Sequence, residues 1–436
     1  MGRHTPFHPR TSALATSLAY KEWAGFASVC AYDRHSEREY FAIRYTAGLL
    51  DVSPLYKYDV KGPDAAAFLS RVWTRNIAKL KVGRATYSAM CDEAGKALDD
   101  GVIVRLDESH YRMTCSEPWL FWFMTHSRGL DVVITDTSEA IAALALQGPL
   151  ARDILDPLVD TDLKTMGFFR ARHTTMAGHD IVITRTGYTG DLGYELWMAN
   201  DAALPVWDAL MEGGAPFGLE PIGLDALDVV RIEAGFVLQG IDYVCAARCA
   251  LESRKSSPYE AGLGWTVNLN RDPFIGSRAL KKEKAEGSPW QLVGLELDWP
   301  AIEQIHDSYG VPPHLAPVSC RAGVPLYTNQ GGTQVGQSTS STWSPVLKRY
   351  VALGQVRTPY AAEGTHLEIE YTIEYERRTI PATVVPMPFF APERTRSTPE
   401  KATPTPTGEQ GGANPKPTSS GSTEEKSGGP HNPGGA

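Results

Sequence analysis

Two kinds of segment interleave along the first 390 residues, and this interleaving limits the fold more than any other feature of the sequence. Short apolar runs such as 101–106 (GVIVRL) and 180–184 (DIVIT) are typical of strands. Segments 201–211 and 224–234 repeat apolar residues every three or four positions, as amphipathic helices do. Because the two kinds alternate without a fixed period, the pattern predicts an α+β fold rather than a doubly wound sheet.

The C-terminal third differs from the rest in composition. Residues 291–390 are rich in Val, Thr and Gly, with many turn signals and little helical periodicity, which predicts a small β-barrel or sandwich domain. From residue 391 onward Pro, Gly, Ser and Thr dominate and large apolar residues disappear. Burial there cannot offset the entropy of ordering, so we expect 391–436 to be a disordered tail without a role in packing.

Charge and composition exclude several classes of protein. With 51 acidic and 42 basic residues the net charge is −9 and no basic block is present, which argues against a nucleic-acid partner. No apolar run approaches the ~20 residues of a membrane span, and the N-terminus lacks a secretory signal. The six cysteines are scattered and fit no metal pattern. We therefore expect a cytoplasmic protein with free thiols and no metal.

Three glycines spaced three apart lie in the segment 186–195 (TGYTGDLGYE), between two strand candidates. A phosphate loop would need a following helix N-terminus, but residues 194–198 continue as a strand, so we interpret the segment as a hairpin-like turn. In one interpretation the glycines only supply positive φ. In the other, Glu195 lies beside two tyrosines and accepts paired hydrogen bonds from the amidine-like edge of a pterin.

Two adjacent acids, Asp99 and Asp100, lead into the strand candidate 101–106. Successive strand residues point to opposite faces, so only one of the two can face a given cavity, and we expect the other to be a solvated or turn-capping acid. A turn without function is the simplest explanation of Asp-Asp-Gly. The functional interpretation makes one carboxylate a proton acceptor or electrostatic partner for a cofactor nitrogen during group transfer.

The segment 223–240 predicts a helix that ends at Gly235. Arg231 follows Asp228 by three residues, close enough for an ion pair on the helix surface. A structural salt bridge and a contact between Arg231 and an anionic or carbonyl group of a ligand are both open.

Further short motifs occur in a fixed order along the chain. They are 51–53 (DVS), 87–88 (YS), Gly95, 99–100 (DD), 146–149 (LQGP), 186–195, 231–235 (RIEAG), 264–266 (GWT), 274–276 (FIG) and 343–345 (WSP). In this order and at this spacing, the motifs resemble the glycine-cleavage T-protein (aminomethyltransferase) family. Relatives of that family include folate-dependent demethylases and the folate domains of dimethylglycine- and sarcosine-oxidising enzymes.

The resemblance implies a three-domain cloverleaf around a folate channel, with tetrahydrofolate as cofactor. A ferredoxin-like domain, about 1–52 and 144–230, interleaves with a second α+β domain, about 53–143 and 231–290. A C-terminal β-barrel domain follows at 291–390.

The resemblance also assigns roles to particular residues. Asp100 aligns with the acid near the reactive folate nitrogens, and Glu195 with the pterin-binding acid. Tyr87 and Tyr188 align with residues that line the channel, and Arg231 with a ligand-contacting arginine.

Some positions depart from the family pattern, on the substrate side as much as the folate side. The departures are Pro54-Leu55 for His-Met, Ser116 for Asn, Leu227 for Arg and Gln239 for Tyr, and a Gly-Trp-x-x-Pro element is absent, with Trp23 its nearest candidate. The implied partner is therefore either a lipoyl carrier protein or a small-molecule one-carbon donor. The corresponding functions are an aminomethyltransferase or a demethylase acting on a sulfonium, methoxyl or methylamine donor. A non-catalytic folate-binding regulator is a third alternative, although its Lys-Gly-Cys-Tyr-x-Gly-Gln-Glu stretch is missing.

Overall fold

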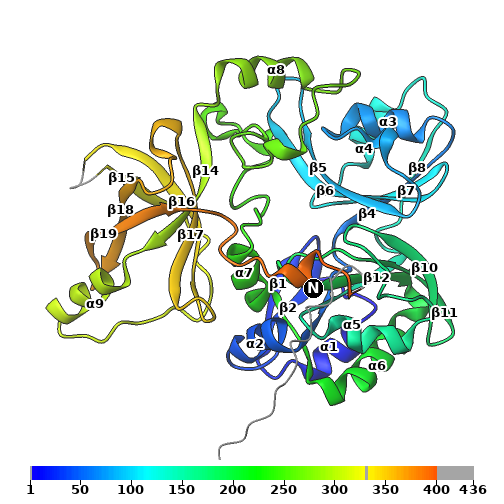
Figure 1. The fold of residues 1–436 in the computed structure, drawn as a ribbon, viewed down its shortest axis with the longest axis horizontal. Helices are drawn as coiled ribbons and strands as arrows, with labels where there is room; N and C mark the ends of the chain where they lie inside the picture. The colour runs from blue at the N-terminus through cyan, green and yellow to red at the C-terminus, as the bar shows by residue number, and fades with distance from the viewer. Residues whose placement is uncertain (1, 329–331, 400–436) are drawn as a thin grey trace, which may run out of the picture.

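Three lobes make up the computed structural model, which describes residues 2–328 and 332–399. Two lobes mix helices and strands and lie at the right of Figure 1, and a β-barrel lies at the left. Within the described residues, no helix is both long and apolar enough to cross a membrane. All six cysteines are free thiols, as the sequence predicted.

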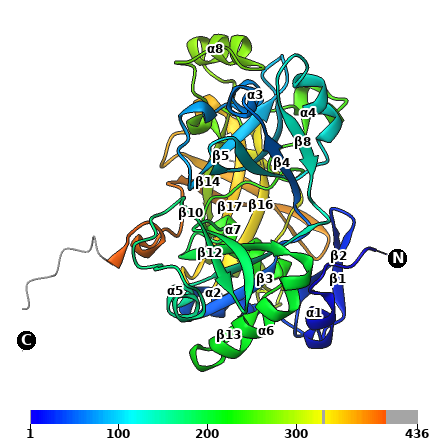
Figure 2. The same cartoon turned by 90° about the vertical axis from the view of Figure 1, so that its right-hand side faces the viewer.

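The first lobe is built on a six-stranded sheet with the order β10-β11-β12-β9-β3-β13. Its central strand β9 is apolar up to its last residue, Gln147, because both faces are covered: Leu144 and Leu146 pack under α5 and α6, while Ala143 and Ala145 pack under α2 and α7. A separate β1-β2 hairpin lies beside it (Figures 1 and 2). The strands are β1 (Ala19–Trp23), β2 (Phe26–Ala31), β3 (Ala47–Asp51), β9 (Ile141–Gln147), β10 (Ala171–Met176), β11 (His179–Thr184), β12 (Gly193–Ala199) and β13 (Leu219–Pro221). The helices are α1 (His8–Leu14), α2 (Glu37–Tyr45), α5 (Ala151–Leu155), α6 (Ala203–Gly214) and α7 (Leu224–Glu233).

The second lobe contains a five-stranded antiparallel sheet with the order β5-β6-β7-β4-β8. Helix α3 places Phe68 and Leu69, and α4 places Phe123, against the sheet residues Tyr58 and Ile103. The strands are β4 (Tyr56–Lys61), β5 (Arg84–Cys91), β6 (Ala97–Asp107), β7 (His110–Cys115) and β8 (Val133–Asp136). The helices are α3 (Ala65–Val72), α4 (Leu120–His126) and α8 (Ser277–Glu286).

The third lobe is a closed barrel with the order β14-β17-β16-β15-β18-β19, in which β19 pairs back with β14. Leu295, Val356 and Ile380 fill its interior, and Ile302 of α9 covers one side. The elements are β14 (Trp290–Leu297), α9 (Trp299–Ser308), β15 (Val324–Tyr327), β16 (Gln334–Ser344), β17 (Arg349–Arg357), β18 (His366–Ile373) and β19 (Glu376–Val385).

One apolar cluster joins the three lobes. It contains Ala89 of the second lobe, Ile232 from α7 of the first, and Val351 and Leu353 of the barrel. The side chains of Tyr87 and Tyr243 belong to the same cluster. The junction of the lobes is therefore a packed centre, and the sequence motifs converge on it.

The segment after the barrel corrects one expectation. Residues 391–399 are not a disordered tail: a short 3₁₀ helix (Glu393–Thr395) lies on the first lobe, at the end of the orange segment that leaves the barrel in Figure 1. The expectation considered only apolar burial, whereas this segment is held by charge and backbone hydrogen bonds. Arg185 donates to the carbonyls of Arg394, Thr395 and Ser397. The rest of the expected tail, 400–436, lies outside the described residues.

Candidate functional site

Asp100 is held between two tyrosines at the junction of the lobes. Strand register brings Tyr87 diagonally opposite Asp100 on the same face of the sheet, since Tyr87 pairs with Val102. Tyr87 donates its hydroxyl to Asp100 Oδ2 at 2.6 Å, and Tyr243 donates to Oδ1. Burial and the nearby Asp100 charge raise the pKa of both tyrosines well above 10, so both hydroxyls stay protonated donors.

Asp99 points to the opposite face, as the strand alternation predicted, but it is not solvated. Its carboxylate is fully buried and accepts five hydrogen bonds, from the backbone amides of Asp100, Ser116 and Glu117, from the Ser116 hydroxyl and from Trp119 Nε1. It therefore acts as a buried turn-capping acid. Both acids lie within β6, so the simple turn interpretation of Asp-Asp-Gly is wrong.

The carboxyl groups of Asp99 and Asp100 differ in how many hydrogen-bond acceptor positions they leave free for a ligand. Burial and the adjacent Asp100 charge raise the pKa of Asp99, and its donors oppose that rise. Burial likewise raises the pKa of Asp100, against the two tyrosine hydroxyls. Each Asp100 oxygen has one protein donor and can accept another, so this carboxyl is the one able to meet a ligand.

Aromatic rings extend the site on both sides of Asp100. The Tyr87 ring stacks on Trp265 with 5.7 Å between centroids, and the Tyr188 ring stacks on Phe236 at 5.6 Å. Tyr188 also donates its hydroxyl to the carbonyl of Val237 at 2.5 Å. Flat, partly exposed rings of this kind suit a planar ligand, because they offer a large contact area at little entropic cost.

The loop that carries Tyr188 joins β11 to β12 as an antiparallel hairpin, as predicted. Gly190 has φ of +71°, but Gly187 and Gly193 are required for another reason: a Cβ on either would lie within about 2.1 Å of the Gln147 side chain. Gln147 fills the loop and accepts a hydrogen bond from the Thr189 hydroxyl at 2.9 Å. The glycines thus allow the loop to close around one buried amide.

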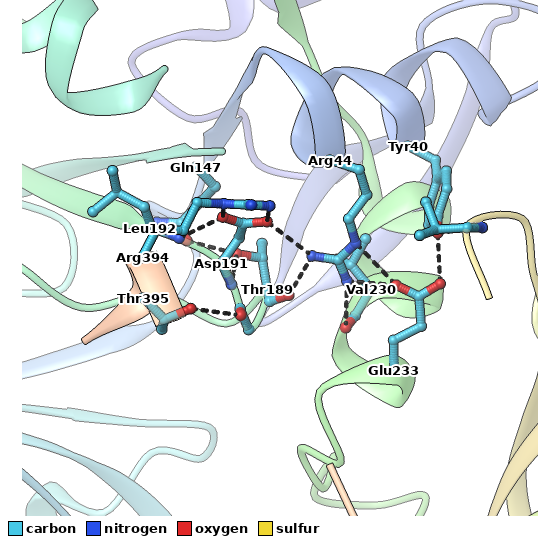
Figure 3. A network of polar contacts seen from close by, with 12 residues as sticks. Tyr40, Arg44, Gln147, Thr189, Asp191, Leu192, Val230, Glu233, Arg394 and Thr395 are labelled. Atoms are coloured by element: carbon cyan, nitrogen blue, oxygen red, sulfur yellow. Dashed lines mark hydrogen bonds and ion pairs between the residues drawn. The ribbon is translucent and has the colours of Figure 1, made fainter. Parts of the chain in front are cut away.

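A chain of ion pairs fixes the same loop from outside (Figure 3). Arg394 forms a bidentate pair with Asp191, at 2.6 and 2.7 Å. Arg44 lies 3.6 Å from Asp191 and also pairs with Glu233 of α7. Thr395 donates to the carbonyl of Gly190 at 3.0 Å. The segment 391–399 therefore clamps the loop that presents Tyr188.

Glu195 is the third residue of β12, two positions after Gly193, and is half-buried. Burial raises its pKa to about 7. Among the described residues, no cation pairs with it, and no hydrogen bond or ion pair joins it to Asp100 or the site tyrosines. It is thus a carboxyl that the protein leaves without a counter-charge.

Arg231 has the ion pair that its spacing predicted. Its Nε donates to Asp228 at 2.8 Å, and its other nitrogens donate to Asp242, to Ser340 of the barrel and to the carbonyl of Phe236. Only 1% of its side chain is exposed. This geometry supports a structural link between α7 and the barrel. It does not support the ligand contact implied by the resemblance, because protein groups enclose the guanidinium.

A cavity of about 370 Å³ adjoins the Asp99 side of the site. Glu117, whose amide donates to Asp99, lines it, as does Gln239, one of the departures from the family pattern. Arg248 pairs with Glu117 at the cavity wall. Within the described residues no group of three or more His, Cys, Asp or Glu side chains could hold a metal ion.

The structure thus brings together Tyr87, Asp100 and Tyr188, and leaves Glu195 and Arg231 outside the Asp100 hydrogen bonds. Sequence reasoning missed Tyr243, which lies in an irregular loop with no periodic signal. The only indication was its position shortly after Gly240 and next to Asp242, an acid–tyrosine pair.

Comparisons with known proteins cover most of the chain. Residues 12–271 match the family model of the GCVT N-terminal domain, and residues 291–391 match the glycine cleavage T-protein C-terminal barrel domain. An aminomethyltransferase of Halothermothrix orenii is 37% identical over 356 residues, which are 81% of this chain and 90% of that protein. An aminomethyltransferase of Bacillus cereus is 36% identical over 360 residues, 81% of this chain and 89% of that protein.

A solved structure agrees with these matches. The glycine cleavage system aminomethyltransferase T from Bartonella henselae superposes with a TM-score of 0.75 at 25% identity, covering 90% of this chain and 99% of that one.

Proposed function

Because the chain belongs to the glycine cleavage T-protein family, we propose that it is a tetrahydrofolate-dependent one-carbon transferase of the aminomethyltransferase type. The observation that supports this most strongly is Asp100, held by Tyr87 and Tyr243 at the centre of the three lobes. A carboxylate oriented by two protonated hydroxyls is suited to stabilise positive charge that develops on a nearby nitrogen.

The residues present fit a reduced folate. Two stacked aromatic pairs, one with Tyr87 and one with Tyr188, flank the acid and match a flat ring system. Glu195 is a half-buried carboxyl without a cation, and its two oxygens can accept paired N–H donors from a pterin edge. Tetrahydrofolate supplies the nitrogen nucleophile that takes up the one-carbon unit.

In this proposal the protein orients the Asp100 carboxylate and provides an acceptor for one proton. Tyr87 and Tyr243 fix the Asp100 carboxylate so that its free lone pairs face the ligand. Asp100 then stabilises the positive charge of the transfer step and accepts the proton released with it. Asp99 stays saturated by its five donors and keeps the strand backbone in place behind the reacting carboxyl.

The one-carbon donor divides the proposal into two forms. The family and its relatives favour an aminomethyl group carried on a lipoyl protein. The second form, a demethylase, takes a methyl group from a small sulfonium, methoxyl or methylamine donor. It has one observation in its favour: Gln239, which departs from the family pattern, lines the cavity beside Asp99.

The product decides between these forms. Purified protein is incubated with tetrahydrofolate and either an aminomethyl-loaded lipoyl carrier or a panel of methylated donors, and the folate product is identified by mass spectrometry. Methylenetetrahydrofolate with release of ammonia supports the aminomethyltransferase. Methyltetrahydrofolate supports the demethylase, and the absence of both products with intact folate binding would contradict the transferase proposal.

A further inference from the structure

Arg75 is a half-buried arginine whose guanidinium has no polar partner among the described residues. It forms no ion pair or side-chain hydrogen bond there, and its Nε is buried without a partner. Burial lowers its pKa, and no acid opposes that effect. Its guanidinium lies over the ring of Trp265, with 5.0 Å between the guanidinium carbon and the ring centroid.

An unpaired, partly desolvated guanidinium is costly to a fold, so an arginine of this kind needs an explanation. The cation–π contact stabilises the folded state by only about 0.5–1 kcal/mol at a partly exposed position. The donors of Arg75 are suited to a planar anion, because a guanidinium binds a carboxylate through two parallel hydrogen bonds. The balance favours an anionic ligand that is supplied from outside the chain.

Arg75 is connected to the candidate site through a row of flat groups. Its guanidinium lies against Trp265, Trp265 stacks on Tyr87 at an interplanar angle of 13°, and Tyr87 donates to Asp100. Trp265 is 61% exposed, so this row opens to solvent at the arginine end. A ligand that reaches Asp100 with its reacting group could therefore place a carboxylate near Arg75.

Buried hydroxyl groups hold the segment that carries Arg75 against the segment that carries Trp265. Thr74 and Thr266, the neighbours of Arg75 and Trp265 in sequence, lie with their hydroxyl oxygens 3.1 Å apart. The Arg75 amide donates to the Ser88 hydroxyl at 3.1 Å, and that hydroxyl also contacts Thr74. The segments that carry the arginine and the indole are thus held together before any ligand arrives.

We propose that Arg75, supported by Trp265, binds a carboxylate of the ligand that occupies the Asp100 site. This inference rests on the proposed function and specifies that the protein recognises a carboxylate of the ligand. The carboxylate has two sources with the same chemistry: the glutamyl group of the folate, or a carboxylate on an amino-acid-type donor.

The test uses Arg75→Met, which keeps much of the side-chain length and removes the charge. Arg75→Lys keeps the charge but not the bidentate geometry. The matched control is Arg128→Met, which neutralises an exposed arginine that forms no ion pair or side-chain hydrogen bond within 2–328 and 332–399. Affinities for tetrahydrofolate and for tetrahydropteroate, which lacks the glutamyl group, are measured by calorimetry under anaerobic conditions. Donor KM is measured with a carboxylate-bearing N-methylated glycine and with a methylamine that carries no carboxylate.

If the folate glutamyl group is the ligand, Arg75→Met weakens tetrahydrofolate binding by about 10- to 100-fold and leaves tetrahydropteroate binding unchanged. Arg75→Lys then gives an intermediate loss. If the donor supplies the carboxylate, tetrahydrofolate affinity is unchanged and the KM of the N-methylated glycine alone rises by a similar factor.

Equal affinities of wild type, Arg75→Met and Arg128→Met for every compound would overturn the inference while leaving the proposed function intact. An equal loss for tetrahydrofolate and tetrahydropteroate would also overturn it, because the effect would not depend on a carboxylate. If the wild-type protein binds neither folate compound, the proposed function fails and the inference fails with it.

Discussion

Two arginines beside the same site have opposite surroundings. Arg231 is enclosed by Asp228, Asp242 and Ser340, and it links α7 to the barrel. Arg75 has no anionic partner among the described residues and lies against Trp265 at the solvent end of the aromatic row. The first is a closed network that stabilises the fold, whereas the second is an open position that a ligand can complete. Asp99 and Asp100 show the same contrast, because the protein supplies five hydrogen bonds to Asp99 and only two to Asp100. The comparison indicates that charged groups with incomplete protein partners mark the functional surface.

The largest expected effect concerns the two acids. Asp100→Asn should lower turnover by about 10²- to 10⁴-fold with little loss of folate affinity, because an amide fills the space but cannot take the proton or stabilise the charge. One of the Tyr87 and Tyr243 hydroxyls can reorient to accept from the amide nitrogen while the other still donates to the amide oxygen, so the fold should tolerate the change. Steady-state kinetics and calorimetry measure the two effects separately.

Asp99→Asn is the matched comparison and should act on stability. An amide nitrogen would face donors that now point at a carboxylate, which costs about 1–3 kcal/mol in the free energy of unfolding. Turnover per folded molecule should change much less than in Asp100→Asn. A reversal of this order would show that the two acids have been assigned to the wrong roles.

The second prediction compares the arginines directly. Arg231→Met should lower the free energy of unfolding by about 3–5 kcal/mol, because buried Asp242 would lose its ion pair with Arg231 and buried Asp228 would keep only the one with Arg321. Arg75→Met breaks no polar contact within the described protein and should change stability by less than about 0.5 kcal/mol. Urea denaturation gives both values. Similar losses in the two variants would remove the distinction between closed and open positions.

The third prediction concerns the segment 391–399. Arg394→Met should cost about 1–3 kcal/mol and also weaken folate binding, since Asp191 and the loop bearing Tyr188 lose their outer anchor. Arg396→Met is the control, because Arg396 is an exposed neighbour that forms no side-chain hydrogen bond or ion pair with the residues that the structure describes. Chains that end at residue 390 and at residue 399 separate the contribution of the described segment from that of the residues beyond it. A chain ending at 390 that melts like the full-length protein would contradict the clamp.

Many of the strands and helices could be predicted from the sequence, because the local spacing of apolar residues differs between the two. The expected strands at 101–106 and 180–184 lie in β6 and β11, and the expected helices correspond to α6 and α7. Gly235 ends α7 with a φ of +68°, as a glycine after a helix commonly does. Composition and turn signals predicted a barrel or a sandwich for the C-terminal domain, and the structure has a closed barrel.

The site was less predictable, because it is assembled by contacts between distant segments. Tyr243 reaches Asp100 across 143 positions of sequence, and no local pattern marks it. Arg394 reaches Asp191 across 203 positions from a segment whose composition indicates disorder. That Arg75 finds no polar partner for its side chain in the described part of the chain is a property of three-dimensional packing, and no sequence pattern marks it.

The smallest expected effect is a pH dependence of folate affinity. Burial raises the pKa of Glu195 to about 7, so at pH 6 most of this carboxyl is protonated and at pH 8 most of it is ionised. If the ionised form accepts the pterin edge, affinity should rise by about tenfold from pH 6 to pH 8. Glu195→Gln should weaken binding by about 1–3 kcal/mol at pH 8 and abolish this dependence. A wild-type affinity that is flat or falls over this range would exclude the assigned role of Glu195.

The most direct test of the central claim, that the junction of the three lobes is a reduced-folate site, is an anaerobic calorimetric titration of the wild-type protein with tetrahydrofolate in the presence of a chelator. We predict saturable binding at one site per chain, with a Kd between about 1 μM and 1 mM and no need for a metal. Asp100→Asn should bind with nearly the same affinity, and Glu195→Gln more weakly. Absence of binding by the folded wild-type protein at millimolar folate would contradict the account.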